Sequence, residues 1–319
     1  MSIRKNWRTL TSSERERFVQ ALHRTKSSGI VDQFADMHAT HFSHGIHRSS
    51  HFLPWHRELL RRFEDELRKH HSDVRIPYWD STVDRSPSDS LWSNSFLGPF
   101  NSAWNLRRAL GSDTLPTGQQ VQTNRARSTY DTFWPELEGV IHNPPHRWVG
   151  GVMASAASPG DPVFYLHHCW IDLLWVLWQQ AHPTAPFVAS GPGLGLNDPL
   201  MEWPDRTSAD VLDHHALGYG YDAEPVLQVD GRLSFLRAHD VGTRFGPPMD
   251  QIDVEIVVRL DTAPGRALGF GLRADSNETA RRAMLDTLRV AFNEDRRVRL
   301  DYQRVGVNNG VLLRVAALS

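Results

Sequence analysis

The stretch Asp161-Pro-Val-Phe-Tyr-Leu-His-His-Cys-Trp-Ile-Asp-Leu-Leu-Trp-Val-Leu-Trp-Gln-Gln180 decides the fold of the larger part of this chain. Its Asp-Pro pair is a helix-start signal, and the residues that follow are apolar on nearly every side. Because such a helix is stable only where all its faces are covered, we expect a buried helix over residues 163–180. Its first half carries the pair His167-His168. The sequence therefore predicts a mainly α fold with histidines inside a helical bundle.

Two helices before this stretch are expected to carry further histidines on apolar faces. In residues 30–42, the side chains of Phe34, His38 and His41 share one face of a helix. Another helix begins at Pro54, a residue favoured in a first helical turn, and places His56 at the inner end of an apolar stripe.

The composition is that of an ordinary globular protein. The chain has 319 residues, of which 40% are hydrophobic, and a formal net charge of −2, so nothing points to nucleic acid or to an anionic membrane. No apolar run reaches the roughly 18 residues that a membrane span needs. The polar, basic start of the chain shows no secretory signal, and a single cysteine, Cys169, fits a reducing compartment. We therefore expect a cytoplasmic protein.

The pattern changes after Tyr221. Residues 252–260, 268–272, 298–302 and 311–315 read as strands, and residues 278–292 read as one helix among them. This predicts two domains, residues 1–223 and a small β-rich domain of residues 224–319. The order of its elements favours a closed barrel of the OB type.

The histidines form two groups that suit a pair of copper ions. His38, His47 and His56 make up the first group, and His142, His146 and the pair His167-His168 the second. Imidazole nitrogen suits copper, and three histidines per metal leave a coordination position open for O₂ and substrate. A zinc site is the alternative, but zinc usually takes four ligands, often with cysteine. The prolines of His142-Asn-Pro-Pro-His146 are tolerable if a helix starts near Asn143.

The chain resembles the bacterial tyrosinases of the type-3 copper family in several ordered motifs, which span residues 3–221. The matching segments are Ile3-Arg-Lys-Asn6, Leu10-Thr11, Phe52-Leu-Pro-Trp-His-Arg57, Ile76-Pro-Tyr-Trp-Asp80, Leu137-Glu-Gly139, His142-Asn-Pro-Pro-His146, Trp148-Val-Gly-Gly151, residues 161–172 and Tyr219-Gly-Tyr221. The resemblance implies a tyrosinase-like helical bundle that holds two copper ions.

Residue by residue, the resemblance gives the ligands of both copper ions. One copper takes His38, His47 and His56, and the other takes His142, His146 and His168. His41 is the rival to His38 as first ligand. His167 is expected to be a packed core histidine.

The resemblance also implies roles around the metals. Glu138 and Asn143 correspond to residues thought to hold a water that deprotonates a phenol; the alternatives are a surface carboxylate for Glu138 and a helix N-cap for Asn143. Asp172, one turn after His168, is expected to accept a ligand's ring N–H or to cap local backbone. The expected pocket residues are Arg147 at the entrance, Met153 and Ser155 in a wall of small side chains, and Phe164 against a ligand. Arg147 is expected either to attract a substrate carboxylate or to be solvated, and the alternative for Phe164 is an ordinary core residue.

The expected function is the oxidation of small phenols with O₂: ortho-hydroxylation of monophenols, oxidation of o-diphenols to o-quinones, or both. Oxidation of catechols alone or of o-aminophenols is the alternative within this class, and a haemocyanin-like O₂ carrier is the alternative outside it. A separate copper chaperone is a further expected partner. Residues 224–319 are expected to serve permanent packing or homo-oligomerisation, with a lid over the copper site as the alternative.

Overall fold

The computed structural model describes residues 2–247, 250–274 and 277–318. The chain divides into two compact units, Met1–Ala223 and Glu224–Ser319. Each unit has its own hydrophobic core.

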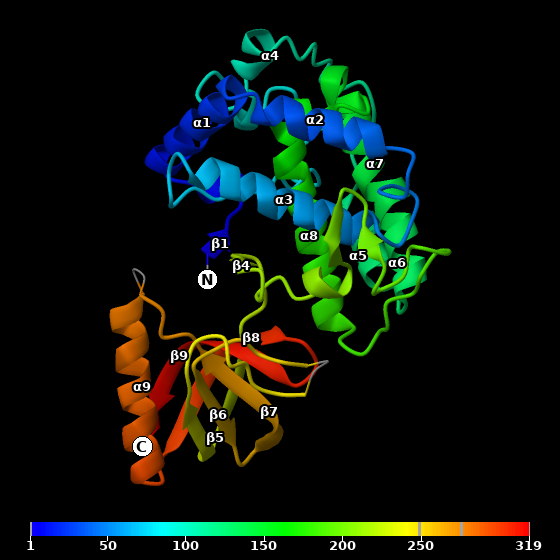
Figure 1. Cartoon of the computed structure of the whole chain (residues 1–319). Coiled ribbons are helices and arrows are strands. Elements are labelled where there is room, and N and C mark those ends of the chain that lie inside the picture. The colour runs from blue at the N-terminus through cyan, green and yellow to red at the C-terminus, as the bar shows by residue number, and fades with distance from the viewer. Residues whose placement is uncertain (1, 248–249, 275–276, 319) are drawn as a thin grey trace. The chain divides into compact units, whose positions relative to one another are not determined.

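The first unit is mainly helical (Figure 1). Its α-helices are α1 (Ser12–Ser27), α2 (Ile30–His41), α3 (Phe52–Arg68), α4 (Phe100–Ala103), α5 (Gly118–Arg125), α6 (Tyr130–Glu136), α7 (Asn143–Val149) and α8 (Val163–Ala181). Leu137–His142 forms a π-helical turn, η3. Short 3₁₀ segments are η1 (Trp7–Thr9), η2 (Ser90–Trp92), η4 (Gly151–Ala154), η5 (Ser158–Gly160) and η6 (Ala209–Val211). The short strands are β1 (Ser2–Arg4), β2 (Pro199–Leu200), β3 (Trp203–Thr207) and β4 (Tyr219–Tyr221).

Helix α8 lies in the core of this unit, as its apolar sequence predicts. Every residue from Val163 to Val176 is buried, including Cys169, which is a free thiol. It packs against α3 and η3, and α1 packs against α2 and α3. Both histidines in the first half of α8 are therefore buried inside the bundle.

The segment from α6 to α7 is one continuous helical path with a wide turn in its middle. Pro144 and Pro145 have no backbone N–H to donate to the carbonyls of the preceding turn. The backbone widens there, and the Asn143 N–H donates to the Glu138 carbonyl, five residues earlier. The expected helix start near Asn143 is thus a continuation from η3, and Asn143 is the first residue of α7, so the N-cap position belongs to His142.

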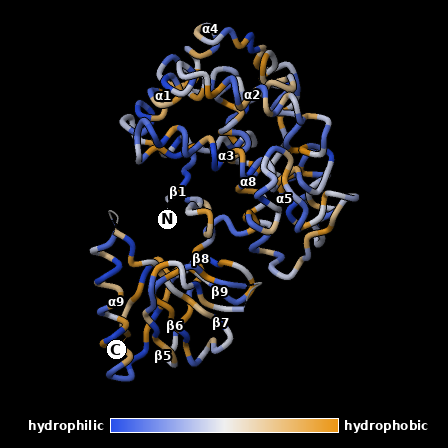
Figure 2. The backbone as a smooth tube through the Cα atoms, in the orientation of Figure 1, coloured by the Kyte–Doolittle hydropathy of each residue, from blue (hydrophilic) through white to orange (hydrophobic). Residues whose placement is uncertain are grey.

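The second unit is a five-stranded closed barrel with the strand order β5-β6-β7-β9-β8. Its elements are β5 (Leu227–Ala238), β6 (Ile256–Leu260), β7 (Ala263–Phe270), α9 (Glu278–Asn293), β8 (Arg297–Val305) and β9 (Asn309–Ala317). β7 and β9 pair in parallel, the other neighbours are antiparallel, and α9 connects β7 to β8. This is the strand order of an OB-type barrel, as expected. In Figure 2, hydrophilic and hydrophobic residues alternate along α9, which packs against β5 and β9.

Strand β5 was not predicted, because its sequence contains Asp230-Gly231 in the middle, and both residue types are unfavourable in strands. Gly231 is required by a close approach: a Cβ there would lie 2.6 Å from side-chain oxygens of Asp261 and Thr262. The strand expected over residues 252–260 begins only at Ile256, and Ile252 instead forms an isolated bridge with Phe245.

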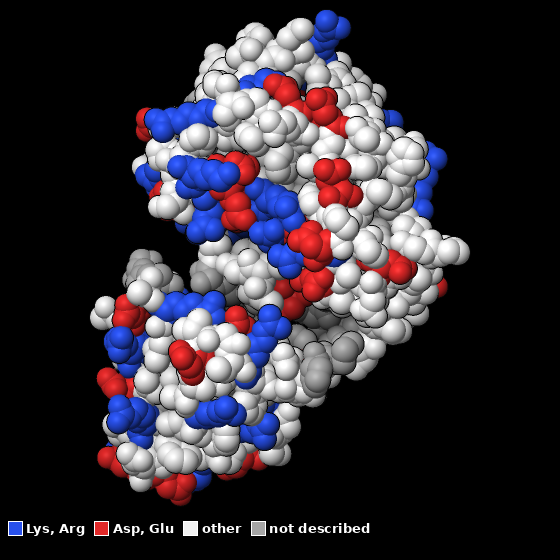
Figure 3. Space-filling model, viewed as in Figure 1, with Lys and Arg blue, Asp and Glu red and all other residues white. Residues whose placement is uncertain are grey.

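Charged residues of both signs are mixed on the surface shown in Figure 3. On α3, for example, Asp65 pairs with Arg61 at 2.9 Å and Glu66 pairs with Lys69 at 2.6 Å. Across the described residues, no helix is both long enough and apolar enough to cross a membrane.

Candidate metal centre

Six histidines converge in the first unit as two groups of three. The first group takes His38 from α2, His47 from the loop that follows α2, and His56 from α3; the second takes His142 from η3, His146 from α7 and His168 from α8. Within each group, the ligand nitrogens all lie within 4.8 Å of one another. The two groups lie next to each other: the imidazole of His56 in the first group stacks on that of His168 in the second, with ring centroids 4.3 Å apart. The arrangement suits two neighbouring metal ions.

Hydrogen bonds fix the orientation of four of these rings. A carbonyl oxygen can only accept, so a ring Nδ1 beside it carries the proton, and the Nε2 lone pair is left for a metal. The Nδ1 atoms of His38, His56 and His146 donate to the carbonyls of Ala156 (2.6 Å), Phe52 (2.8 Å) and Met153 (2.8 Å), and that of His142 donates to Asn143 Oδ1 (2.9 Å).

The donor set fits copper by its chemistry. Burial lowers the pKa of His38 and His146 to about 4 and that of His47 to about 2, and it holds the pKa of His56, His142 and His168 well below the usual range. The rings are therefore neutral near pH 7. Their unprotonated Nε2 atoms face one another, at 3.0 Å for His142 and His146 and 3.4 Å for His38 and His56. Facing lone pairs repel unless a cation lies between them, and neutral imidazole is a favoured donor for copper.

The neighbouring histidines are used elsewhere. The Nε2 atom of His41, the rival first ligand, lies 2.8 Å from a Glu202 carboxylate oxygen, outside the group. His51 Nε2 lies 2.9 Å from the Gly195 carbonyl. His167 Nε2 donates to the His142 carbonyl at 3.0 Å, so His167 supports the backbone of a ligand and is a packed core residue, as expected.

A third set, Asp213, His214 and His215, also brings ligand-type atoms within 4.8 Å of one another. These residues are consecutive, and the Asp213 carboxylate accepts the His215 backbone N–H at 2.9 Å. A local turn therefore accounts for their closeness without a metal.

Glu138 is buried, so it is not a surface carboxylate. Both of its carboxylate oxygens lie 2.9 Å from the backbone nitrogen of Arg48, the residue after His47. Burial raises the pKa of Glu138 to about 7, against the opposing effect of this hydrogen bond. Arg48 has a φ of 54°, which is uncommon for a residue other than glycine. Glu138 thus holds the loop that carries His47, a role that nothing in the sequence indicated.

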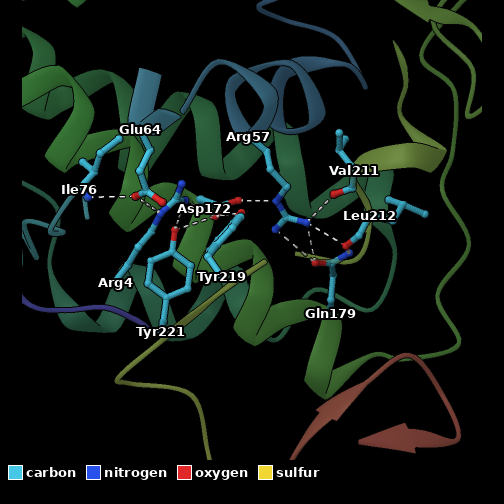
Figure 4. Close-up of polar contacts among 10 residues, drawn as sticks. All are labelled: Arg4, Arg57, Glu64, Ile76, Asp172, Gln179, Val211, Leu212, Tyr219 and Tyr221. Carbon is cyan, nitrogen blue, oxygen red and sulfur yellow. Dashed lines mark hydrogen bonds and ion pairs between the residues drawn. The ribbon is translucent and has the colours of Figure 1, made fainter. Parts of the chain in front are cut away.

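The expected role of Asp172 is corrected by its contacts, which Figure 4 shows. Its carboxylate accepts from Arg57 Nε at 2.6 Å and from the hydroxyls of Tyr219 and Tyr221 at 2.7 and 2.6 Å, and Arg4 lies 3.6 Å away. Asp172 therefore neither binds a ligand's ring N–H nor caps local backbone. Position i+4 brings it near His168 along α8, but the cationic and hydroxyl donors of other elements take its acceptor capacity.

This network joins the ends of the first unit. Arg4 on β1 also donates to Glu64 Oε2 at 3.0 Å, and its guanidinium lies 3.7 Å from the centre of the Tyr219 ring. β1 pairs in parallel with β4, so the start of the chain lies beside residues 219–221. The Arg57 Nη1 atom donates to the backbone carbonyls of Val211 and Leu212, which ties α3 to the same region (Figure 4).

The expected pocket residues have different surroundings. Phe164 is buried, and its ring centroid lies 4.0 Å from that of His168 and 5.4 Å from that of His38. Met153 is buried, and its backbone carbonyl accepts a hydrogen bond from the ring of His146. Ser155 is exposed and donates to the Val152 carbonyl. Arg147 is exposed and forms an ion pair with Asp113, which competes with the expected attraction of a substrate carboxylate.

Several supporting groups could not be found from the sequence. The carbonyls of Ala156, Phe52 and Met153 orient ligand rings, but a backbone carbonyl carries no residue-type signal. The sequence indicated Phe42 only as the last residue of a predicted helix, whereas its ring centroid lies 4.6 Å from that of His47.

Comparison with known proteins agrees with this geometry. A family model described as the common central domain of tyrosinase matches residues 28–106 and 100–181. A tyrosinase of Streptomyces antibioticus is 40% identical over 265 residues, which covers 67% of this chain and 97% of the relative. Grixazone synthase of Streptomyces griseus subsp. griseus is 32% identical over 303 residues and covers 69% of this chain and 99% of the relative. Among solved structures, deoxygenated hemocyanin from Rapana thomasiana shares the fold, with a TM-score of 0.55, 19% identity and 99% coverage of both chains.

Proposed function

The chain belongs to the tyrosinase family, and from this premise we propose that it hydroxylates monophenols in addition to oxidising o-diphenols to o-quinones. As a type-3 copper oxidase, it holds a pair of copper ions, and the six histidines of the two groups are the residues that would bind them. When bound, the copper pair supplies the activation of O₂. Enzymes of the family oxidise phenols with O₂.

The observation that carries the proposal is the position of Asn143. Its side-chain oxygen accepts from the Nδ1 atom of His142 at 2.9 Å, so the amide group lies directly beside a ligand. The amide NH₂ group then remains to donate to a water or to a phenol oxygen. Glu138, four residues before His142, is buried, and its carboxylate accepts from the backbone N–H of Arg48, the neighbour of the ligand His47. A carboxylate that accepts a proton and an amide that positions a water or the phenol oxygen would together help a phenol with a pKa of about 10 to lose its proton near pH 7.

Two substitutions at Asn143 test this proposal. Asn143→Ala removes the whole amide and should lower turnover of tyrosine by about 10²–10⁴-fold, with a much smaller loss for a simple catechol. Asn143→Asp keeps an oxygen acceptor for His142 but replaces the NH₂ donors with a second carboxylate oxygen and adds a negative charge, so it should show the same selectivity if donation by the NH₂ group is what acts. Equal losses on tyrosine and catechol would mean that Asn143 only orients His142.

The alternatives from the sequence are separated by the same substrate panel. The two sequence relatives compared above, which match over nearly their whole length at 40% and 32% identity, are named as enzymes, whereas the hemocyanin structure shares only 19% identity; this does not favour an O₂ carrier. The relative named tyrosinase is 40% identical, against 32% for grixazone synthase, which supports phenols as substrates. Turnover of an o-aminophenol in preference to tyrosine and catechol would overturn this choice.

For residues 224–319 we propose permanent packing or homo-oligomerisation, not the role of a lid. In support, the barrel is closed, so its strands are paired on both sides, and it has a core of its own. The Streptomyces antibioticus tyrosinase matches only 67% of this chain with 97% of its own length, so a catalytic unit of this kind occurs without the barrel. Cleavage after Ala223 should lower the number of chains per particle in solution or the solubility. Strong activation would favour a lid.

A cytoplasmic location and a copper chaperone are also proposed. Reconstitution of the purified chain with free copper tests the second point. Full loading and full activity without a partner would make the chaperone unnecessary.

A further inference from the structure

Within each group of three histidines one member is more exposed than the other two, and these two members indicate where the centre opens. In the first group, His38 and His56 are buried and His47 is partly exposed; in the second, His142 and His168 are buried and His146 is partly exposed. A small molecule meets the partly exposed members first. From this exposure we infer that the centre opens beside His47 and His146.

Phe42 flanks this opening on the side of His47. It is the C-cap residue of α2, one residue beyond the last helical turn that carries His38. Its ring centroid lies 4.6 Å from that of His47, with an interplanar angle of 45°, and 5.8 Å from that of His38. The residue nevertheless remains 39% exposed. One part of the ring packs on two ligands, and another part faces outward at the mouth of the centre.

The contrast with Phe164 shows that the two phenylalanines have different roles. Phe164 also contacts ligand rings, at 4.0 Å from His168, but it is 0% exposed and serves as a wall. Exposed apolar side chains are common on protein surfaces, so the exposure of Phe42 alone would carry no meaning. Its meaning comes from the place: a half-exposed aromatic ring against the partly exposed ligand of the first group.

The segment that approaches the ligands from the other direction offers little aromatic surface. The carbonyls of Met153 and Ala156 accept from His146 and His38, so residues 153–156 run along the rings. Ala154 and Ser155 in this segment are exposed and small. A planar substrate at the opening would thus meet space on the side of this segment and an aromatic face at Phe42.

We propose that Phe42 is a specificity-determining residue that stacks against the aromatic ring of the substrate as it enters the centre. Offset or edge-to-face packing of two aromatic rings is favourable at centroid separations of about 4.5–7 Å. Phe42 contributes to binding of the ring and takes no part in proton or electron transfer. The inference deepens the proposed function, since it rests on an aromatic substrate at this site.

The test separates ring binding from all other effects of the residue. Benzoate and acetate both present a carboxylate to the copper-loaded protein, and only benzoate carries a ring. Their dissociation constants can be followed through the copper(II) absorption, which needs no turnover. Phe42→Ala should weaken benzoate binding by about two- to tenfold and leave acetate unchanged. The same variant should raise KM for catechol by a similar factor with little change in kcat, and Phe42→Trp should restore both.

The controls and contrary outcomes are specific. Phe292, on α9 of the other unit, is 43% exposed, so Phe292→Ala matches Phe42→Ala in residue type and exposure. It should leave the dissociation constants of benzoate and acetate unchanged. An unchanged benzoate constant in Phe42→Ala would overturn the inference. So would equal weakening of acetate or a loss of copper, because the residue would then act through His47. Absence of phenol turnover would sink the proposed function, while the benzoate measurement would still report on Phe42.

Discussion

The two groups of histidines reach similar geometries by different means. His142, His146 and His168 all lie on helical backbone, in η3, α7 and α8. In the other group, His38 and His56 lie on α2 and α3, but His47 lies on the loop between them. A helix fixes the direction of a side chain through its own hydrogen bonds, whereas a loop residue needs an external contact. For His47 that contact is the Glu138 carboxylate on the Arg48 N–H.

The difference teaches that the first group depends on the second. Glu138 lies on η3, the element that also carries His142, so the support of the loop comes from the other half of the centre. Asp172 provides a second link, because it lies on α8 with His168 and binds Arg57, the neighbour of His56 on α3. The two halves are thus joined by buried charged groups as well as by apolar packing.

Removing one ligand from either group should have the largest effect. His56→Ala and His168→Ala should each reduce oxidation to background, because a single remaining site cannot complete the copper pair. Copper content should fall from two per chain towards one, with a far-ultraviolet spectrum like that of the parent. His41→Ala is the matched control, since His41 pairs with Glu202 outside the centre. Substantial activity in either ligand variant would contradict the six-histidine assignment.

Acid should destabilise the copper-free protein through both groups. Burial depresses the pKa of His38 and His146 to about 4, so the unfolded chain binds protons that the folded chain does not as the pH falls below about 6.5. Stability is therefore present above this pH and is lost on the way to pH 4, at about 1.4 kcal/mol per pH unit for each such histidine. Urea unfolding from pH 7.5 to 4.5 measures the slope. A copper-free protein whose stability does not change over this range would contradict the neutral buried rings.

Breaking the link at Asp172 should lower the free energy of unfolding strongly. Asp172→Ala leaves the buried guanidinium of Arg57 without its counter-ion, a change that typically costs about 3–5 kcal/mol. Burial alone would raise the pKa of Asp172, but Arg57 and Arg4 hold it below its usual value, so the carboxylate is charged near pH 7. Glu66→Ala, which removes an exposed partner of Lys69 on α3, should cost only about 0.2–1 kcal/mol. Similar urea midpoints for the two variants would mean that the ion pair of Asp172 contributes no more to stability than an ordinary surface pair.

A change at Glu138 should affect one copper ion more than the other. Glu138→Ala frees the loop that carries His47, and loss of such a supporting contact typically weakens metal binding by about 10–100-fold. Glu138→Gln retains an oxygen acceptor for the Arg48 N–H and should be milder. Copper titration should become biphasic in the alanine variant, with one ion bound as in the parent. Glu136→Gln, which alters an exposed pair with Arg127, should leave the titration unchanged. Equal weakening of both ions would mean that the two halves do not differ in the way described here.

The sequence by itself determined the elements whose signals are local. An apolar run with a helix-start pair produced α8, and the resemblance to the family selected His38 over His41. The motif order assigned the chain to its family, and the alternation after Tyr221 produced four of the five barrel strands in part and α9 almost to the residue. These features follow from the periodicity of side chains along a helix or strand, which a single segment displays without its neighbours.

Only the tertiary structure decided which polar groups meet. The Asp172 carboxylate was expected to contact a ligand, but it accepts hydrogen bonds from donors on β4 and α3 instead. The Glu138 carboxylate binds the backbone N–H of Arg48. Gly231 lies within β5, where the turn after β6 approaches the backbone closely. Carbonyls that orient the ligand rings have no signature in the sequence at all. Such pairings depend on hydrogen bonds between segments far apart in the chain, and periodicity within one segment carries no information about them.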